Sequence, residues 1–383
     1  MFGPRGTGKT TFLKGFFGPD TADYIDLLNI EEEEIIARNP AELERRVLAM
    51  GPEKQWVVID EIQRIPRLLD LVHRLIESTT VKFAITGSSG RKLKRGASNL
   101  LAGRAFINHL HPLTLNEIGH GVPLLDLLRW GSLPKVLLLK SPKEKIEFLR
   151  SYTHSYLREE IAAEQLVRRL DPFRNFLAVA AQCNGQELNF SRIARDVGAD
   201  YKTVQSYFEI LADTMMGFLL PVWNRSVRKR QSTRPKFYFF DIGIKRALDY
   251  TVSQELYEGS YPFGSVFEHF VLLELIRLND YFRRDFRFSY LRTPAGLEID
   301  LVIDRPGAPV ALIEIKSTVQ ARDEDCAGVN TLIKDVPDAE AYCISRDPHR
   351  KKIGSTLCIP YQNAAEELGL AGTSLERNRM LTP

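Results

Sequence analysis

The sequence is poor in the features that mark several common classes of protein. It has four cysteines in 383 residues and no CxxC pair, so the spacing suggests neither a zinc site nor a disulfide framework. It contains no signal peptide and no apolar run of membrane-spanning length, so we expect a cytoplasmic protein without a membrane partner. The net charge of +3 is small, so any nucleic-acid partner must be argued from local patches. The cysteines are Cys183, Cys326, Cys343 and Cys358.

What is present is ordinary globular composition, with 44% hydrophobic and 26% charged residues. The length predicts about two or three domains. We expect an α/β domain over residues 1–118, a helical and winged-helix region over 119–245, and a second α/β domain over 246–370. Residues 371–383 are expected to form a frayed tail.

The first 118 residues alternate short apolar runs with helical patterns, which favours a parallel sheet with helices on both faces. The runs at 23–28, 55–61, 81–89 and 105–110 predict buried strands, and those at 40–50 and 65–78 predict helices. Farther on, residues 265–345 are interpreted as helix, strand, strand, helix, strand.

The opening stretch GPRGTGKT is a phosphate-binding pattern. Glycines at these positions let backbone N–H groups close around a phosphate, Lys9 adds a positive charge, and the Thr10 hydroxyl can ligate Mg²⁺. The helix that follows points its positive end at the anion. The predicted nucleotide-binding residues are Gly3, Gly6, Gly8, Lys9, Thr10 and Thr11.

Two later stretches extend this site. The strand WVVIDE delivers Asp60 as a second Mg²⁺ contact and Glu61 as the base for an attacking water. The strand FAITGSS places Thr86 or Ser88 beside a γ-phosphate. Arg104 in LAGRA is either a sensor of the γ-phosphate, an arginine finger for a second copy of the chain, or an ordinary surface arginine. Together these patterns predict ATP and Mg²⁺ as ligands.

The middle region contains a helix-turn-helix pattern. Ala194, Gly198 and Val204 stand at its small, turn and anchor positions, and Lys202 and Gln205 face outward. Two strand-like runs follow and flank a basic stretch, which indicates a wing. Its cations either neutralise DNA phosphates or simply face solvent while the module docks a protein. The basic residues are Arg225, Arg228, Lys229, Arg230, Arg234 and Lys236.

The last region holds a second constellation of charges. Asp300 lies on one strand, and Glu314 and Lys316 share a face of the next, after a helix that carries Glu268. Charges on an apolar strand are costly unless paired or functional. The order matches the PD-(D/E)xK nuclease arrangement, in which carboxylates hold Mg²⁺ and the lysine orients water. The alternative is the same fold with a Glu314–Lys316 ion pair and no cleavage.

In this order, VVIDEIQ, ITGSS, LAGR, HPLTLNEI, GSLPKV, KFYFFDIGI, FEHFVLLEL and IEIKS resemble prokaryotic predicted ATPases that join an AAA-type domain to a C-terminal domain of unknown function. That C-terminal domain is similar to restriction-endonuclease-like folds. The resemblance implies Gly8, Lys9, Thr10, Asp60 and Glu61 as the ATP site. It also implies a nuclease-like cluster at Glu268, Asp300, Glu314 and Lys316, and it implies no known cellular role.

The sequence departs from this family at its start. Such proteins carry a strand before the phosphate loop, whereas only Met1 and Phe2 precede Gly3. A strand usually needs about five or six residues. We therefore expect the true start to lie upstream, and a slot for the missing strand between the runs at 55–61 and 81–89. The two hypotheses for the whole chain are an ATPase that acts on DNA and a nucleotide-switched module that docks a protein or a second copy.

Overall fold

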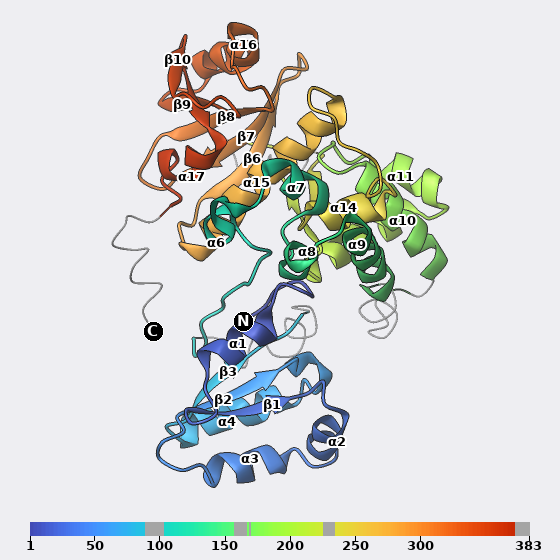
Figure 1. Cartoon of the computed structure of the whole chain (residues 1–383), viewed down its shortest axis with the longest axis vertical. Helices are drawn as coiled ribbons and strands as arrows, with labels where there is room; N and C mark the ends of the chain where they lie inside the picture. The colour runs from blue at the N-terminus through green and yellow to red at the C-terminus, as the bar shows by residue number, and fades with distance from the viewer. Residues whose placement is uncertain (89–102, 157–166, 168–169, 225–233, 372–383) are drawn as a thin grey trace. The chain divides into compact units, whose positions relative to one another are not determined.

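The computed structural model describes residues 1–88, 103–156, 167, 170–224 and 234–371. The chain divides into two compact units (Figure 1). The N-terminal unit comprises residues 1–112 with 209–216, and the C-terminal unit comprises 113–208 with 217–383. The predicted boundary at 245/246 therefore separates two regions that lie within one compact unit. No helix in the described ranges combines the length and apolarity needed to cross a membrane.

The N-terminal unit is built on a parallel sheet, as the alternating pattern predicts, and its strands lie in the order β1-β2-β3. Ile25, Val57 and Ile59 face a core shared with α2, α3 and α4, while Val58 faces Leu13 of α1 on the opposite side. Helices thus cover both faces. The elements are α1 (Lys9–Phe16), β1 (Ala22–Asp26), α2 (Ile30–Arg38), α3 (Ala41–Leu48), β2 (Trp56–Asp60), α4 (Leu68–Ser78) and β3 (Lys82–Ile85).

The predicted slot between the second and third runs is wrong, because β2 and β3 pair directly from Trp56↔Lys82 onward. Phe2 lies instead on the other side of β3, bridged in parallel to Gly87 and to His109. The predicted strand at 105–110 is also wrong in extent. Only the bridge at His109 forms, because Phe2 offers it a single residue to pair with.

The C-terminal unit begins with a run of helices, as predicted for the middle of the chain. α10, α11 and α12 are followed by the antiparallel hairpin β4–β5, which is the element order expected of a winged helix. The elements are α6 (Leu115–Ile118), α7 (Leu124–Trp130), α8 (Pro134–Leu138), α9 (Pro142–Tyr156), α10 (Leu170–Gln182), α11 (Phe190–Val197), α12 (Tyr201–Asp213), β4 (Gly217–Leu220), β5 (Lys236–Phe239) and α14 (Ile242–Leu248).

A six-stranded mixed sheet follows, in the order β10-β11-β9-β8-β7-β6. α15 packs on one face through Phe267 and Val271, and α16 packs on the other through Val329. The sequence interpretation missed β6, β10 and β11. The elements are α15 (Tyr261–Tyr281), β6 (Arg287–Arg292), β7 (Glu298–Asp304), β8 (Val310–Lys316), α16 (Asp323–Leu332), β9 (Ala339–Ser345), β10 (Lys351–Ile353), β11 (Thr356–Pro360) and α17 (Ala364–Glu367).

A buried polar network ties the start of the C-terminal unit to its interior. The Arg277 guanidinium donates to Leu113 O at 3.2 Å, Ser132 Oγ at 2.9 Å and Phe240 O at 2.8 Å. The fully buried Asp241 carboxylate accepts from Ser132 N at 2.9 Å. Buried charges are tolerated when they are paired and hydrogen-bonded, and this network meets that condition. It joins three of the segments on which the family resemblance rests.

Candidate functional site

The phosphate loop has the backbone geometry that its glycines predict. Gly6 and Gly8 have φ angles of 80° and 95°, in the left-handed region that glycine adopts without strain. A Cβ on Gly3 would lie 2.2 Å from Leu110 O, so only glycine fits there. Lys9 is 5% exposed, and its Nζ donates to Gly3 O at 2.8 Å and to Pro4 O at 3.1 Å. The loop is therefore closed around its own lysine.

Asp60 lies at the C-terminal end of β2, completely buried. Its Oδ2 accepts from Thr10 Oγ1 at 2.7 Å and from Tyr24 OH at 2.7 Å, and its Oδ1 accepts from Thr86 Oγ1. The structure thus brings three of the predicted residues together and adds Tyr24, which sequence reasoning missed. Burial raises the pKa of Tyr24, and its hydrogen bond to Asp60 raises it further.

Glu61 follows directly in a left-handed conformation, with φ of 61°. Such a conformation is uncommon for a residue other than glycine and tends to mark functional positions. Its carboxylate accepts from Gln63 Nε2 and from Ser88 Oγ at 3.3 Å. Gln63 is buried, and its Oε1 has no hydrogen-bond partner among the described residues. Gln63 carried no sequence signal, because its role depends on the turn after β2.

Two predicted residues lie at the surface. Arg104 is exposed and pairs with Glu77 of α4 at 2.8 Å, so its role as a sensor or finger stays a prediction. Thr11 is exposed on α1.

The charges of the C-terminal sheet gather as predicted, and we call Glu268, Glu298, Asp300 and Glu314 the acidic cluster. Asp300 Oδ2 accepts from Ile315 N at 2.8 Å, and Lys316 Nζ pairs with Glu314 Oε2 at 3.0 Å. Burial raises the pKa of Glu314 to about 8, with Asp300 adding repulsion. Burial likewise raises the pKa of Glu268 to about 7, again with repulsion from Asp300. The Lys316 side chain is 37% exposed, so the ion pair is open to solvent.

Strand β5 contributes two residues to this cluster that sequence reasoning did not assign. Tyr238 OH donates to Glu268 Oε1 at 2.6 Å, and Lys236 forms an ion pair with Glu298. The prediction that Lys236 belongs to a solvent-facing basic wing is wrong. Lys236 is 4% exposed because the alternation of β5 turns it, with Tyr238, toward the cluster.

The helix-turn-helix stays a prediction, although the turn between α11 and α12 lies where it was expected. Gly198 ends α11 in a left-handed conformation with φ of 67°, and Ala194 and Val204 are buried. Lys202 and Gln205 are exposed on α12. The predicted DNA contacts Arg228, Lys229 and Arg230 lie outside the described residues, as do Arg225 and residues 372–383 of the predicted tail.

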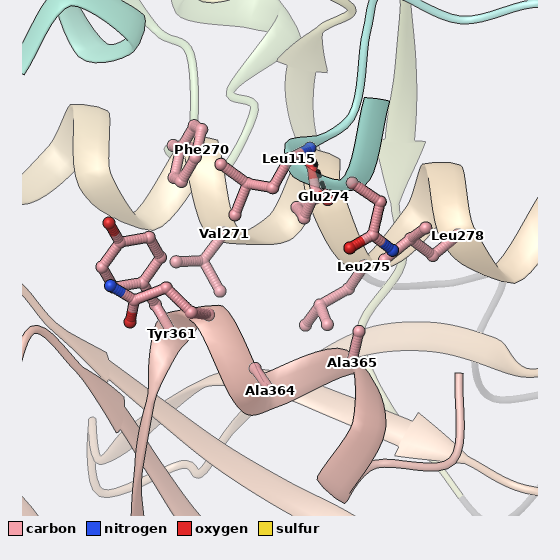
Figure 2. Close-up of a pocket in the computed structure, with 11 residues that line it drawn as sticks. Leu115, Phe270, Val271, Glu274, Leu275, Leu278, Tyr361, Ala364 and Ala365 are labelled. Atoms are coloured by element: carbon pink, nitrogen blue, oxygen red, sulfur yellow. Dashed lines mark hydrogen bonds between the residues drawn. The ribbon is translucent and has the colours of Figure 1, made fainter. Parts of the chain in front are cut away.

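A small cavity lies between α15 and the segment Tyr361–Ala365 (Figure 2). Its volume of about 20 Å³ is enough for about one water molecule, so it is too small for a substrate. Glu274 lines it and accepts from Leu115 N at 2.9 Å. Burial raises the pKa of Glu274 to about 7.

Three family models match the chain in succession. Residues 1–119 match a family described as an AAA domain. Residues 123–255 match a domain of unknown function, DUF8612, and residues 263–363 match another, DUF4143. The chain is thus similar to an AAA domain in its N-terminal part and to two domains of unknown function after it.

Curated relatives cover most of the chain. An uncharacterized protein of Mycobacterium tuberculosis is 28% identical over 326 residues, which is 83% of this chain and 70% of that protein. An uncharacterized protein of Methanocaldococcus jannaschii is 23% identical over 302 residues, 72% of this chain and 66% of that protein.

Solved structures give weaker matches. Aeropyrum pernix ORC1 in complex with DNA matches 67% of this chain and 87% of that chain at 13% identity, with a TM-score of 0.26. Drosophila ORC bound to AT-rich DNA and Cdc6 matches 67% and 85% at 10% identity, with a TM-score of 0.21. Scores this low do not establish a shared fold.

Proposed function

We propose that the AAA-type domain binds ATP with Mg²⁺ and hydrolyses it. The observation that carries this proposal is the convergence of Thr10, Asp60 and Thr86 beside the closed loop around Lys9. A hydroxyl and a carboxylate 2.7 Å apart are hard oxygen ligands, the kind that Mg²⁺ takes. The donor set therefore fits the ion, which would neutralise charge on the phosphates.

Each residue has a distinct task in this reaction. Lys9 exchanges its bonds to Gly3 O and Pro4 O for phosphate oxygens. Glu61 accepts a proton from the attacking water, and Ser88 and Gln63 hold its carboxylate in place until then. Thr86 holds Asp60 and Glu61 in place, because its hydroxyl donates to Asp60 and accepts from Glu61 N at 3.2 Å.

Phosphate release by purified protein tests this proposal. Glu61→Gln keeps the shape of the side chain but removes the base, so ATP binding should persist while turnover falls by about 100-fold or more. Glu53→Gln, at an exposed position ahead of β2, is the matched control and should turn over at the parental rate. If Glu61→Gln hydrolyses ATP as fast as the parent, Glu61 is not the base. Binding without phosphate release in the parent would favour the nucleotide-switched interaction module.

A second candidate function is Mg²⁺-dependent cleavage of nucleic acid at the acidic cluster. Two observations favour it. The elements from α15 to β9 run in the order helix, three antiparallel strands, helix, parallel strand, and the carboxylates meet where β7 and β8 lie side by side. Glu268, Asp300 and Glu314 offer the oxygen ligands that a hard divalent ion takes, although among the described residues their ligand atoms do not form a group close enough to hold a metal ion as they stand. The Glu314–Lys316 ion pair is compatible with the competing inactive fold.

Cleavage of DNA with Mg²⁺ or Mn²⁺ separates these alternatives. Asp300→Ala should abolish cleavage by an active cluster, and Asp323→Ala, on the exposed start of α16, should not. Absence of cleavage of both single- and double-stranded substrates by the parent protein would favour the inactive fold.

DNA binding through the helix-turn-helix has its own test. Replacing Arg228, Lys229 and Arg230 with alanine should weaken DNA binding. It should also reduce the dependence of the binding constant on salt concentration, by the amount expected for the loss of about three phosphate contacts. Lys202→Ala tests the exposed face of α12 in the same assay, with an expected loss of about one phosphate contact. A dissociation constant that stays the same across the salt titration would assign this module to protein docking.

A further inference from the structure

Three of the four cysteines meet at one point in the C-terminal unit. Cys326 comes from α16, Cys343 from β9 and Cys358 from β11, and each is 0% exposed. Their sulfur atoms all lie within 4.8 Å of one another, and the Sγ atoms of Cys326 and Cys358 are 3.6 Å apart. The fourth, Cys183, is half-buried just after α10. We call Cys326, Cys343 and Cys358 the thiol cluster.

The register of the sheet explains why the thiols converge. Cys343 pairs with Cys358 in the parallel ladder of β9 and β11, and Cys358 pairs with Lys351 on β10. Paired residues of neighbouring strands project from the same face, so one row across the sheet carries Glu314, then two thiols and then a lysine. α16 covers this face and places Cys326 above the row. The apolar neighbours of the thiols are Val302, Leu312, Val329, Leu332 and Ala341.

The geometry fits a three-coordinate metal site. Metal–sulfur bonds of about 2.3 Å in a planar trigonal arrangement place the sulfur atoms about 4 Å apart. The observed spacing, 3.6 Å for one pair and within 4.8 Å for all, brackets that value. No His, Asp, Glu or further Cys joins the group among the described residues.

The missing fourth ligand decides the class of ion. Structural zinc sites close with four protein ligands, and complete burial leaves no water to complete the set. Soft thiolate ligands select Cu(I) when hard ligands and water are excluded. We propose that the thiol cluster is a binding site for a soft monovalent cation of low coordination number, with Cu(I) as its representative.

Binding at this site is an exchange of protons for the ion, without oxidation or reduction. Burial raises the pKa of Cys326 to about 12 and raises those of Cys343 and Cys358, so the empty cluster is fully protonated. The ion forms bonds to sulfur as the S–H bonds break and the protons leave to solvent. The product carries negative charge, and Lys351, which lies across the ladder from Cys358 and is already ion-paired with Asp347 at 2.6 Å, offsets only part of it.

The test is anaerobic titration of the full chain with Cu(I) against a competing chelator. The chain should bind about one tightly held ion, detected by near-ultraviolet thiolate-to-copper absorption. Cys343→Ser should weaken binding by about 10-fold or more, because outright loss of a ligand costs more than the second-shell changes that already cause 10–100-fold losses. Cys183→Ser is the matched control and should bind as the parent does. Circular dichroism shows whether each variant is folded.

A measurement on the unaltered chain keeps the proposal falsifiable if the serine variants fail to fold. Copper X-ray absorption should show three sulfur neighbours at about 2.3 Å. Two sulfur neighbours, loss of binding only in Cys183→Ser, or Zn²⁺ displacing Cu(I) at equal concentration would each overturn the proposal. The result does not depend on ATP hydrolysis or nucleic-acid cleavage.

Discussion

Two sites in this molecule stabilise buried carboxylates in different ways. In the N-terminal unit, Asp60 accepts hydrogen bonds from three hydroxyl groups. In the acidic cluster, Asp300 and Glu314 lie against other carboxylates, and lysines supply the compensation. In the acidic cluster, burial and repulsion raise the pKa values of Glu268 and Glu314. The hydroxyl groups around Asp60 stabilise its carboxylate without a cation. In the acidic cluster, the carboxylates repel one another, and a bound cation would relieve that repulsion.

The largest expected effect comes from removing the positive charge of the N-terminal site. Lys9→Ala should lower ATP affinity by about two orders of magnitude, because charge-assisted hydrogen bonds are worth roughly 1.5–3 kcal/mol each. Titration with a fluorescent nucleotide measures this loss. Lys54→Ala, ahead of β2, serves as the control. Unchanged affinity in Lys9→Ala, with the fold intact, would contradict the assignment of the loop.

The comparison itself is tested by making the same substitution in both sites. Without metal, Asp60→Asn should destabilise the protein by about 1–3 kcal/mol, because an amide donor would then face hydroxyl donors. Asp300→Asn should stabilise it, because it removes the charge that repels Glu268 and Glu314. Thermal melting in EDTA shows whether each variant raises or lowers the melting temperature.

The effect of added Mn²⁺ on melting distinguishes the two sites further. It should raise the melting temperature of the parent through the acidic cluster and leave Asp300→Asn unchanged. Asp323→Asn, which is exposed, should respond to Mn²⁺ as the parent does. If Asp60→Asn and Asp300→Asn shift metal-free melting in the same direction, the two sites do not differ as described.

Glu274 is an intermediate case, with one backbone donor and a pKa raised to about 7 by burial. A carboxyl whose folded pKa lies above its ordinary value of 4.5 favours the protonated folded state. Its contribution to stability is therefore lost as pH rises from about 4.5 through 7. Glu274→Gln keeps the acceptor oxygen and should reduce this decline in stability by up to about 3 kcal/mol between about pH 5 and 8. Urea unfolding across that range measures it, with exposed Glu366→Gln as the control.

The smallest effect is expected at Tyr24. Tyr24→Phe removes one of the three hydroxyl donors to Asp60 and leaves Thr10 and Thr86 in place. Stability should fall by about 1 kcal/mol, and ATP turnover should stay within a few-fold of the parent. Tyr257→Phe, at an exposed position, should change neither quantity. A loss of turnover as large as that expected for Glu61→Gln would give Tyr24 a direct role in the chemistry.

The sequence was sufficient where function depends on neighbouring residues or on a repeating pattern. The phosphate loop, the strand ending in Asp60, and the shared face of Glu314 and Lys316 all follow from local spacing. The parallel arrangement of the first sheet followed from alternation alone, but the direct pairing of β2 with β3 and the position of Phe2 beside β3 did not.

What the sequence missed depends on packing between distant elements. Tyr24 reaches Asp60 from the neighbouring strand, and Lys236 reaches Glu298 from 62 positions away. The thiol cluster joins residues separated by up to 32 positions, with no spacing that marks it. No periodic pattern in the sequence predicts these contacts, because each depends on the order of the strands and the register between them.

The Arg277 network has a practical consequence for dividing the protein into fragments. A fragment that starts at residue 113 retains Leu113 O and Ser132 Oγ, and so keeps every partner described for the guanidinium. A fragment cut after residue 132 would leave Arg277 with Phe240 O alone and deprive Asp241 of Ser132 N. Breaking a buried charge network costs roughly 3–5 kcal/mol. The shorter fragment should therefore be recovered aggregated, and residue 113 marks where an expression clone of the C-terminal unit should begin.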